Sequence, residues 1–287
     1  MQVTARRVAS LPPTRDFNPL QQSSPGCRIF WRRQGALRSV LWNGAALLEV
    51  EGGDTLRIDT LRSADGFPAE ILNLAVALLL SGRGHQILHA GGLARDGVLA
   101  AILGPPGSGK SSLVLAGGRR GMQVVSDEII PFRMRGTSFV CPGSNPVVRV
   151  DPRRAPVEVR EETRQESRGP ATGARDKVAV DVRHCGWRCA EGASRLALIV
   201  LLGPRLGRGA PRYRLERLAP AEALIGLLDN TFNRRVLTAA ELRRHLRCFA
   251  SVAKELPAYR LRVRSGMTNV AAAARGVDQR LARLRTT

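Results

Sequence analysis

One short stretch of the sequence has the residue types and the spacing of a phosphate-binding loop. Residues 104–111 read Gly-Pro-Pro-Gly-Ser-Gly-Lys-Ser. The glycines let successive backbone N–H groups turn toward one anion, Lys110 adds a positive charge, and the hydroxyl of Ser111 suits Mg²⁺. A glycine-rich turn that only joins a strand to a helix is the alternative. We expect a nucleotide-phosphate site made by the following residues: Gly104, Pro105, Pro106, Gly107, Ser108, Gly109, Lys110, Ser111 and Ser112.

Two adjacent carboxylates, Asp127 and Glu128, follow the next apolar stretch. Residues 122–126 read Met-Gln-Val-Val-Ser, which is typical of a core strand. Ligands of open α/β sheets bind at the carboxyl ends of strands, so we expect both acids beside the phosphates. A carboxylate there can take up the proton of an acceptor hydroxyl, or help to hold the metal. The alternative is a solvated strand end with no chemical role.

The segments around the loop have the order strand, loop, helix that phosphate binding requires. Residues 97–103 predict a buried strand, and residues 111–117 predict a helix whose N-terminus faces the phosphates. An earlier strand is predicted at residues 86–94, joined to the first by Asp96-Gly97, which is a strong hairpin signal. A single helix then separates the loop from Asp127. AAA-type ATPases, which have a similar loop, place their acidic pair much further on.

Together these motifs resemble the catalytic core of the HPr kinase family. The resemblance rests on His89-Ala-Gly-Gly-Leu-Ala-Arg-Asp-Gly-Val-Leu, on the loop at 104–111, and on Gly121-Met-Gln-Val-Val-Ser-Asp-Glu128. It covers residues 84–132, and a weaker similarity to small HPr-kinase-like proteins, including those of lasso peptide clusters, extends to residue 262. The resemblance implies an α/β fold, with a P-loop core of the HPr kinase/PEP carboxykinase-like type and a mixed sheet. A small antiparallel β region would precede that core.

The resemblance also implies a role for each matching residue. Lys110 would contact the transferred phosphate, Ser111 would bind Mg²⁺, and Asp127 would act as the catalytic base. His89 would be a further active-site residue, although a lone His on an apolar strand can also be a hydrogen-bonded core residue. Glu128 could help to hold the metal through water. ATP and Mg²⁺ are the implied cofactors.

The chain departs from the bifunctional HPr kinases in one respect. Their second acidic signature, Glu-Ile-Arg-Gly-Leu-Gly, has no clear equivalent here, so neither a reverse phosphorylase activity nor HPr as the substrate is implied. Residues 151–176 predict a charged loop. For Lys177, at the start of an expected strand, a phosphate role and an ordinary strand-end charge are both open.

The pattern of the whole chain divides it into four expected parts. Short apolar stretches broken by turn residues predict antiparallel strands between residues 27 and 60, followed by a helix at 68–80. Further on, strands are expected at 195–203, 213–218 and 256–263, and helices at 220–228 and 239–253. The four parts are a flexible arm (1–26), a β region plus helix (27–83), the HPr-kinase-like catalytic domain (84–264) and a basic C-terminal tail (265–287).

The composition of the chain limits which classes of partner and which cellular location we expect. The net charge is +21, and arginine carries nearly all of it, since lysine occurs only at Lys110, Lys177 and Lys254. A basic surface favours acidic partners, but the arginines are scattered and rarely alternate with aromatic residues. We therefore expect no specific nucleic-acid partner. The five cysteines favour free thiols over a disulfide framework. The apolar runs are too short to span a bilayer, which predicts a cytoplasmic protein.

The sequence therefore predicts an ATP- and Mg²⁺-dependent phosphotransferase that phosphorylates a hydroxyl. The expected acceptor is a serine of a peptide or small protein, with acidic character. Two alternatives stay open: a small-molecule kinase on the same core, and a nucleotide-binding regulatory protein with little turnover. The sequence also leaves open whether the chain forms a homo-oligomer.

Overall fold

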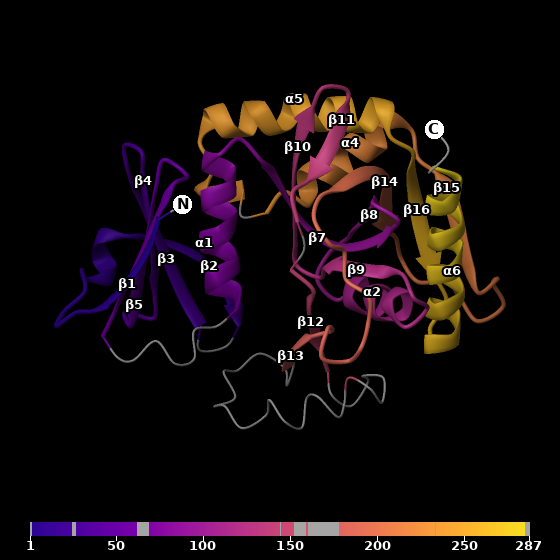
Figure 1. Ribbon diagram of the computed structural model, residues 1–287, viewed down its shortest axis with the longest axis horizontal. Coiled ribbons are helices and arrows are strands. Elements are labelled where there is room, and N and C mark those ends of the chain that lie inside the picture. The colour runs from indigo at the N-terminus through magenta and orange to yellow at the C-terminus, as the bar shows by residue number, and fades with distance from the viewer. Residues whose placement is uncertain are drawn as a thin grey trace.

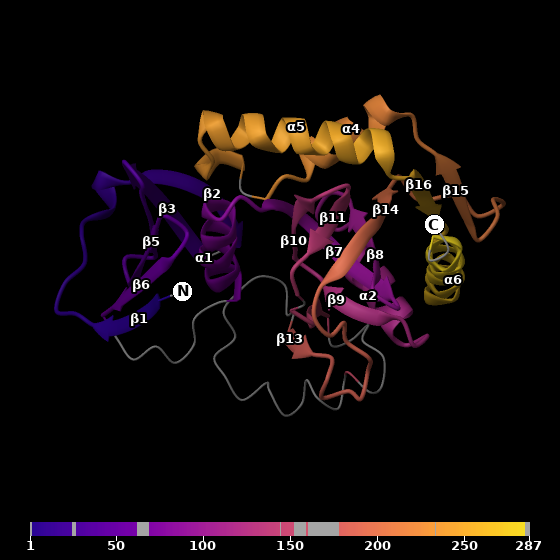
Figure 2. The same ribbon diagram turned by 45° about the horizontal axis from the view of Figure 1, so that its top comes forward.

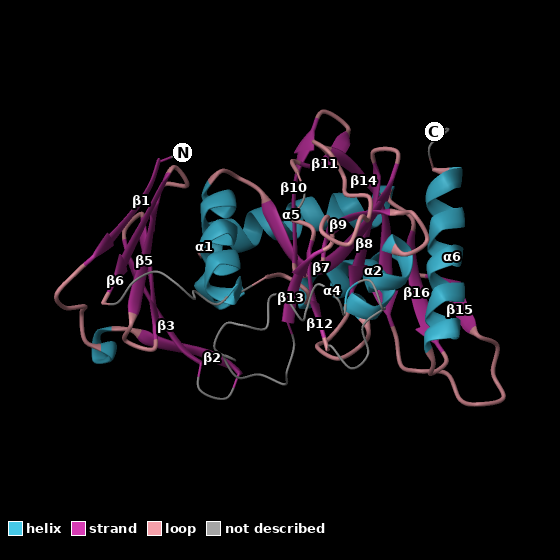
Figure 3. Ribbon diagram, turned by 60° about the horizontal axis from the view of Figure 1, so that its bottom comes forward, coloured by secondary structure: helices cyan, strands magenta, loops and turns pink. Residues whose placement is uncertain are grey.

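The computed structural model describes residues 2–24, 27–61, 69–143, 145–151, 159, 178–232 and 234–284 (Figure 1). A β-sheet built from the N-terminal part of the chain and a larger α/β unit lie on opposite sides of helix α1 (Ala69–Gly82), as Figure 3 also shows. Apart from Asp151 and Val159, the charged loop expected at 151–176 lies outside the described residues, and so does Lys177.

The N-terminal sheet has the strand order β1-β6-β5-β4-β3-β2. Strands β3 to β6 pair antiparallel in chain order, as the alternating stretches predicted. The turn between β4 and β5 is tight because Asn43 and Gly44 adopt φ of 48° and 67°, the left-handed region that such hairpins need. The strands are β3 (Cys27–Gln34), β4 (Leu37–Trp42), β5 (Ala46–Glu51) and β6 (Thr55–Thr60).

The first 26 residues contain two strands, so the prediction of a flexible arm is wrong for this segment. β1 (Gln2–Arg7) pairs parallel with β6, and β2 (Asn18–Ser24) pairs antiparallel with β3. The short 3-10 helix η1 (Thr14–Asp16) lies between them, and Phe17 and Leu20 bury their side chains in the sheet. The parallel partner β1 makes the sheet mixed rather than purely antiparallel. The side chains of β1 are all exposed, which is why its sequence lacks the apolar alternation of a strand.

Helix α1 is apolar on both sides because it is packed on both sides. One side meets the N-terminal sheet, and the other meets residues of the larger unit. Their common core includes Val40, Leu48, Ile58, Ile71, Leu74, Leu78, Ile87, Ile129 and Phe232. The helix therefore joins the two sheets through one continuous apolar layer.

The larger unit is built on an 8-stranded mixed sheet in the described part of the chain, with the order β11-β10-β7-β8-β14-β16-β15 and with β9 paired to β7. β8, β14 and β16 run parallel, and β7 runs antiparallel to β8. The strands are β7 (Gln86–Arg95), β8 (Val98–Leu103), β9 (Gln123–Ser126), β10 (Ile129–Arg135), β11 (Ser138–Cys141), β14 (Ser194–Leu202), β15 (Tyr213–Arg217) and β16 (Ala258–Val263). A separate pair is formed by β12 (Val147–Val150) and β13 (Val178–Asp181).

Helices cover both faces of this sheet (Figure 2). Helices α4 (Pro220–Asp229) and α5 (Ala239–Glu255) pack on one face, and α2 (Lys110–Gly118) and α6 (Met267–Arg283) pack on the other. Helix α6 buries Ala273, Val277 and Leu281 in the same core as α2, so the segment expected as a separate basic tail is an integral part of this unit. No helix in the described part of the chain is long and apolar enough to cross a membrane.

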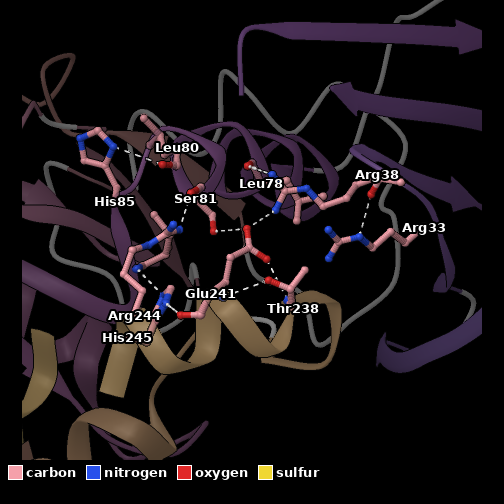
Figure 4. Close-up of polar contacts among 12 residues, drawn as sticks. Arg33, Arg38, Leu78, Leu80, Ser81, His85, Thr238, Glu241, Arg244 and His245 are labelled. Carbon is pink, nitrogen blue, oxygen red and sulfur yellow. Dashed lines mark hydrogen bonds and ion pairs between the residues drawn. The ribbon is translucent and has the colours of Figure 1, made fainter. Parts of the chain in front are cut away.

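A buried polar cluster also links the N-terminal sheet to the larger unit (Figure 4). Glu241, in the first turn of α5, accepts hydrogen bonds from Arg38 Nη1 at 2.8 Å and from Ser81 Oγ at 3.1 Å. The backbone N–H of Thr238 also donates to Glu241, at 2.8 Å, which completes a capping box. Strand β4, helix α1 and helix α5 are thus joined at one carboxylate.

Candidate active site

Strand β7 brings the motifs of the sequence together. β8 pairs antiparallel with it, placing Leu103 opposite Ala90, and β9 pairs antiparallel with it, placing Ser126 opposite Gly92. β8 and β9 therefore run in the same direction on either side of β7, and their carboxyl ends lie at the same end of it. The loop 104–109 follows the carboxyl end of β8, and Asp127 follows the carboxyl end of β9.

The loop needs glycine where the sequence places it. Gly104, Gly107 and Gly109 adopt φ of 153°, 79° and 106°, all in the range that favours glycine. A Cβ on Gly104 would lie 2.8 Å from Ser108 Oγ and would fill the inside of the turn. Gly109 caps α2, so the N–H groups of the first helical turn lack partners within the helix and are suited to an anion.

Within the described residues, the buried hydroxyl of Ser108 has no hydrogen-bond partner. A buried hydroxyl without a partner costs free energy, and a phosphate oxygen in the loop would supply the acceptor that it lacks. The loop therefore fits the phosphates of the implied nucleotide.

Lys110 lies against the loop. Its Nζ donates to Gly104 O at 2.6 Å and to Pro105 O at 3.4 Å, and the residue is 7% exposed. A buried ammonium held by carbonyl oxygens is positioned to compensate the charge of an anion in the loop.

His89, which the sequence predicts as an active-site residue, is linked to the loop through Asn230 and is influenced by the charge of Lys110. Burial, and to a lesser extent the positive charge of Lys110, lower the pKa of His89 from 6.5 to about 4, so the imidazole is neutral at neutral pH. Its ring stacks on Phe232, with a centroid distance of 6.1 Å and an interplanar angle of 16°. A neutral imidazole there can accept or donate a hydrogen bond, but it adds no positive charge that would attract a phosphate.

Asp127 is buried beside the middle of β7. Its Oδ2 accepts a hydrogen bond from Arg149 N at 3.2 Å, and its Oδ1 lies 3.8 Å from the position of a Cβ on Gly91. The same Cβ would lie 2.6 Å from Val114 Cγ2 of α2, so glycine at position 91 lets the phosphate-loop helix approach β7. Asp127 thus lies where β7, α2 and β12 pack together.

Glu128 points toward α1. Its Oε2 accepts a hydrogen bond from Asn73 Nδ2 at 2.5 Å, and Ser126 Oγ accepts from the N–H groups of Glu128 and Ile129, each at 3.3 Å. These contacts shape the turn from β9 to β10, in which both acids lie.

Asn230, at the end of α4, was not singled out by the sequence. Its Oδ1 accepts from Gly104 N at 3.0 Å, and its backbone oxygen accepts from His89 N at 2.8 Å. Its own Nδ2 donates to Gly226 O at 2.8 Å, which fixes the orientation of the amide. One side chain therefore ties the first residue of the loop to α4, while its main chain holds His89.

The expected metal role of Ser111, Asp127 and Glu128 stays a prediction. In the part of the chain that the structure describes, no three His, Cys, Asp or Glu side chains converge on a possible metal position. Mg²⁺ is commonly held by one or two carboxylates together with substrate phosphates, and the hydroxyl of Ser111 with the carboxylate of Asp127 is a donor set of that kind, whereas Glu128 is directed toward Asn73 of α1.

Comparison with known proteins shows distant structural similarity only. No family model matches the chain, and no curated protein sequence matches it. Among solved structures, the fold is similar to the Hpr(Ser) kinase/phosphatase from Coxiella burnetii, with a TM-score of 0.35 and 15% sequence identity, over 69% of this chain and 97% of that one. A likeness of this size leaves the function to be argued from the residues themselves.

Proposed function

We propose that this protein is an ATP- and Mg²⁺-dependent phosphotransferase that phosphorylates a hydroxyl, with a serine of a peptide or small protein as the acceptor. The observation that supports it best is the arrangement around β7. A glycine loop with a buried lysine lies at one side of this strand and a buried aspartate lies at the other, and a neutral histidine lies on the strand itself, opposite Ile129.

In this proposal the loop and the first turn of α2 hold the phosphates. Backbone N–H groups and Lys110 bind the β- and γ-phosphate oxygens, and Ser108 donates to one of them. Asn230 keeps the loop in position through Gly104. Mg²⁺, held by Ser111 and a carboxylate, would neutralise charge on the β- and γ-phosphates.

Asp127 acts on the acceptor. Its carboxylate orients the hydroxyl and takes its proton as the acceptor oxygen forms a bond to the γ-phosphorus. The bond from that phosphorus to the β–γ bridging oxygen breaks at the same time, and ADP leaves with the electron pair. His89 contributes as a neutral group beside the transferred phosphate.

Transfer of label from γ-labelled ATP to a panel of serine peptides, small proteins and hydroxylated metabolites tests the proposal. We expect labelled peptide, and we expect Asp127→Asn to lower the rate by at least about 100-fold while ATP still binds. Asp54→Asn, the same chemical change at an exposed site of the N-terminal sheet, is the matched control.

The same experiment separates the alternatives. Label on a metabolite alone would indicate a small-molecule kinase. Tight ATP binding without transfer to any acceptor would indicate a regulatory protein, and full activity of Asp127→Asn would remove the proposed base.

A further inference from the structure

The last strand of the large sheet has an open edge beside a group of arginines. β15 pairs with β16 on one side, and no other described strand pairs with its outer edge. Such an edge presents unpaired N–H and C=O groups that can accept a further strand. The surrounding arginines, named here the arginine shelf, are Arg205, Arg208, Arg212, Arg214, Arg262 and Arg264.

The arginine shelf has little local compensation for its charge. Its members have no ion pair with a described carboxylate, whereas the neighbouring Arg260 pairs with Glu222 at 2.9 Å. Arg205, Arg208, Arg212 and Arg214 are exposed. The segment from Gly203 to Arg214 contains no acidic residue at all. Glu216 of β15 is the one carboxylate on this described strand, so the edge keeps an excess of positive charge, which attracts an acidic partner.

Two members of the shelf face each other directly. Arg214 of β15 lies opposite Arg262 of β16 in the antiparallel register. Like charges at directly opposed positions of a sheet destabilise it. A bound carboxylate between the two guanidinium groups would remove this repulsion, so the pair is better suited to the liganded state than to the free one.

The shelf is an ordered part of the fold. Arg264 Nη1 donates to Arg208 O at 2.9 Å and to Ala210 O at 3.1 Å, and Arg264 N donates to Arg212 O at 3.0 Å. These bonds fasten the segment after β14 to the end of β16, so the backbone that carries the shelf is fixed, and the guanidinium group of Arg264 is part of this fastening.

The shelf lies at the same end of the sheet as the phosphate loop. β8, β14 and β16 run parallel, so the loop, the segment after Leu202 and Arg264 all follow carboxyl ends at one edge. A Cβ on Gly104 would lie 3.1 Å from Leu202 Cβ. Four strand spacings, about 19 Å, separate β8 from a strand added beyond β15. An extended chain covers that distance in about six residues.

We propose that an acidic, extended segment of the phosphate acceptor binds as an added strand along β15, with its carboxylates on the arginine shelf. The segment would lie about six residues from the phosphorylated hydroxyl. That this partner is the acceptor rests on the proposed function, but the docking surface itself does not. A nucleic acid fits less well, because the rings of β15 and β16 are not available for stacking on bases. Tyr213 packs on Gly276 of α6, and Tyr259 lies under the guanidinium groups of Arg217 and Arg280, at 5.4 and 4.8 Å.

Direct binding without ATP tests the surface. The probe is a short fluorescein-labelled peptide in which Glu alternates with Thr, so that one face of the strand carries all the carboxylates. We expect fluorescence anisotropy to show binding that weakens with salt, and that weakens by about tenfold or more in Arg214→Glu/Arg262→Glu. Arg133→Glu/Arg135→Glu, the same double charge reversal on β10, is the matched control and should bind like wild type.

Two modified peptides and an oligonucleotide test the mode of binding. A peptide with Gln in place of Glu should bind weakly. So should one with the same carboxylates but with N-methyl groups on the amides of Glu and Thr alike, because it cannot donate main-chain hydrogen bonds from either edge. Equal binding of the N-methylated peptide would overturn strand addition. Tighter binding of oligothymidylate than of the Glu peptide, or equal affinity of the double variant, would overturn the acidic-peptide surface. If the double variant does not fold, as judged by circular dichroism, Arg208→Glu in the connecting segment replaces it.

The link to phosphate transfer has its own readout. With a serine placed about six residues from the acidic stretch, the shelf variant should raise KM for the peptide and leave kcat and KM for ATP unchanged. Unchanged KM for the peptide would show that the segment does not deliver the acceptor. If the peptide binds as expected but no phosphate is transferred to it or to any other acceptor, the proposed function fails while the docking surface stands.

Discussion

Asn73 Nδ2 and Glu128 Oε2 are joined by a hydrogen bond of 2.5 Å, which links helix α1 to the turn that carries both acids of the candidate site. Asn73 is largely buried, and Asp127 is the residue directly before Glu128. The helix that joins the two sheets therefore also holds the turn in which the proposed catalytic base lies.

Asn73→Ala tests this link. The substitution leaves the Glu128 carboxylate without this donor, and we expect a loss of about 1–3 kcal/mol in the free energy of unfolding. It should also lower kcat, because the turn with Asp127 is less well fixed. Denaturant unfolding and peptide phosphorylation measure the two effects. Val76→Ala, at an exposed position of the same helix, is the control. Unchanged stability and kcat in Asn73→Ala would show that the bond does not position the acid.

Asn230→Ala should weaken nucleotide binding. Without its Oδ1, the N–H of Gly104 loses its acceptor and the loop is less well ordered for phosphate, so we expect the Kd for MgATP to rise about tenfold. Asn230→Asp keeps the acceptor but adds a negative charge near the phosphates, and its Kd should rise further. Calorimetric titration measures both, with Asn18→Ala of the N-terminal sheet as the control. Equal affinity of Asn230→Ala, Asn230→Asp and Asn18→Ala for MgATP would show that Asn230 does not order the loop for phosphate.

The lowered pKa of His89 predicts a specific pH dependence. The folded state holds this imidazole neutral down to about pH 4, whereas the unfolded chain protonates it near its ordinary value of 6.5. Stability should therefore fall as the pH falls from 6.5 toward 4, by up to about 3 kcal/mol from this residue. His89→Phe, which keeps a ring against Phe232, should lack this pH-dependent loss of stability. Chemical denaturation across that pH range compares the two proteins, and parallel curves would contradict the lowered pKa.

The buried ion pair between Arg38 and Glu241 should be costly to break from one side. The two charged atoms are 2.8 Å apart, and their side chains are 8% and 11% exposed. Arg38→Met leaves a buried carboxylate without its guanidinium, for which we expect a loss of about 3–5 kcal/mol. The exposed pair of Arg83 and Asp54 is the matched comparison, and Arg83→Met should cost less than about 1 kcal/mol. Similar losses for both variants would show that the buried pair does not hold the sheets together.

Local pattern was enough to find the core of the candidate site. The Asp96-Gly97 hairpin forms with φ of 48° and 79°, and the order of strand, loop, helix and acidic strand end is as expected. These features depend on residues close in sequence, where glycine, turn residues and apolar runs restrict the backbone directly.

The supporting residues could not be found in this way. Asn73 contacts Glu128 across 55 positions and Asn230 contacts Gly104 across 126 positions, so their roles come from tertiary packing alone. β1 was missed for a different reason. Its side chains are exposed, and its place in the sheet comes from main-chain pairing with β6, which leaves no hydrophobic pattern.

Calorimetric titration of the protein with MgATP is the most direct test of the account, because every proposed step requires a triphosphate in the loop. We predict one site in the wild-type protein, and at least about a tenfold rise in Kd for Lys110→Met, which removes the ammonium held at Gly104 O. Lys254→Met in α5 should bind like the wild type. Absence of binding to the wild type, or equal affinity in Lys110→Met, would contradict the account.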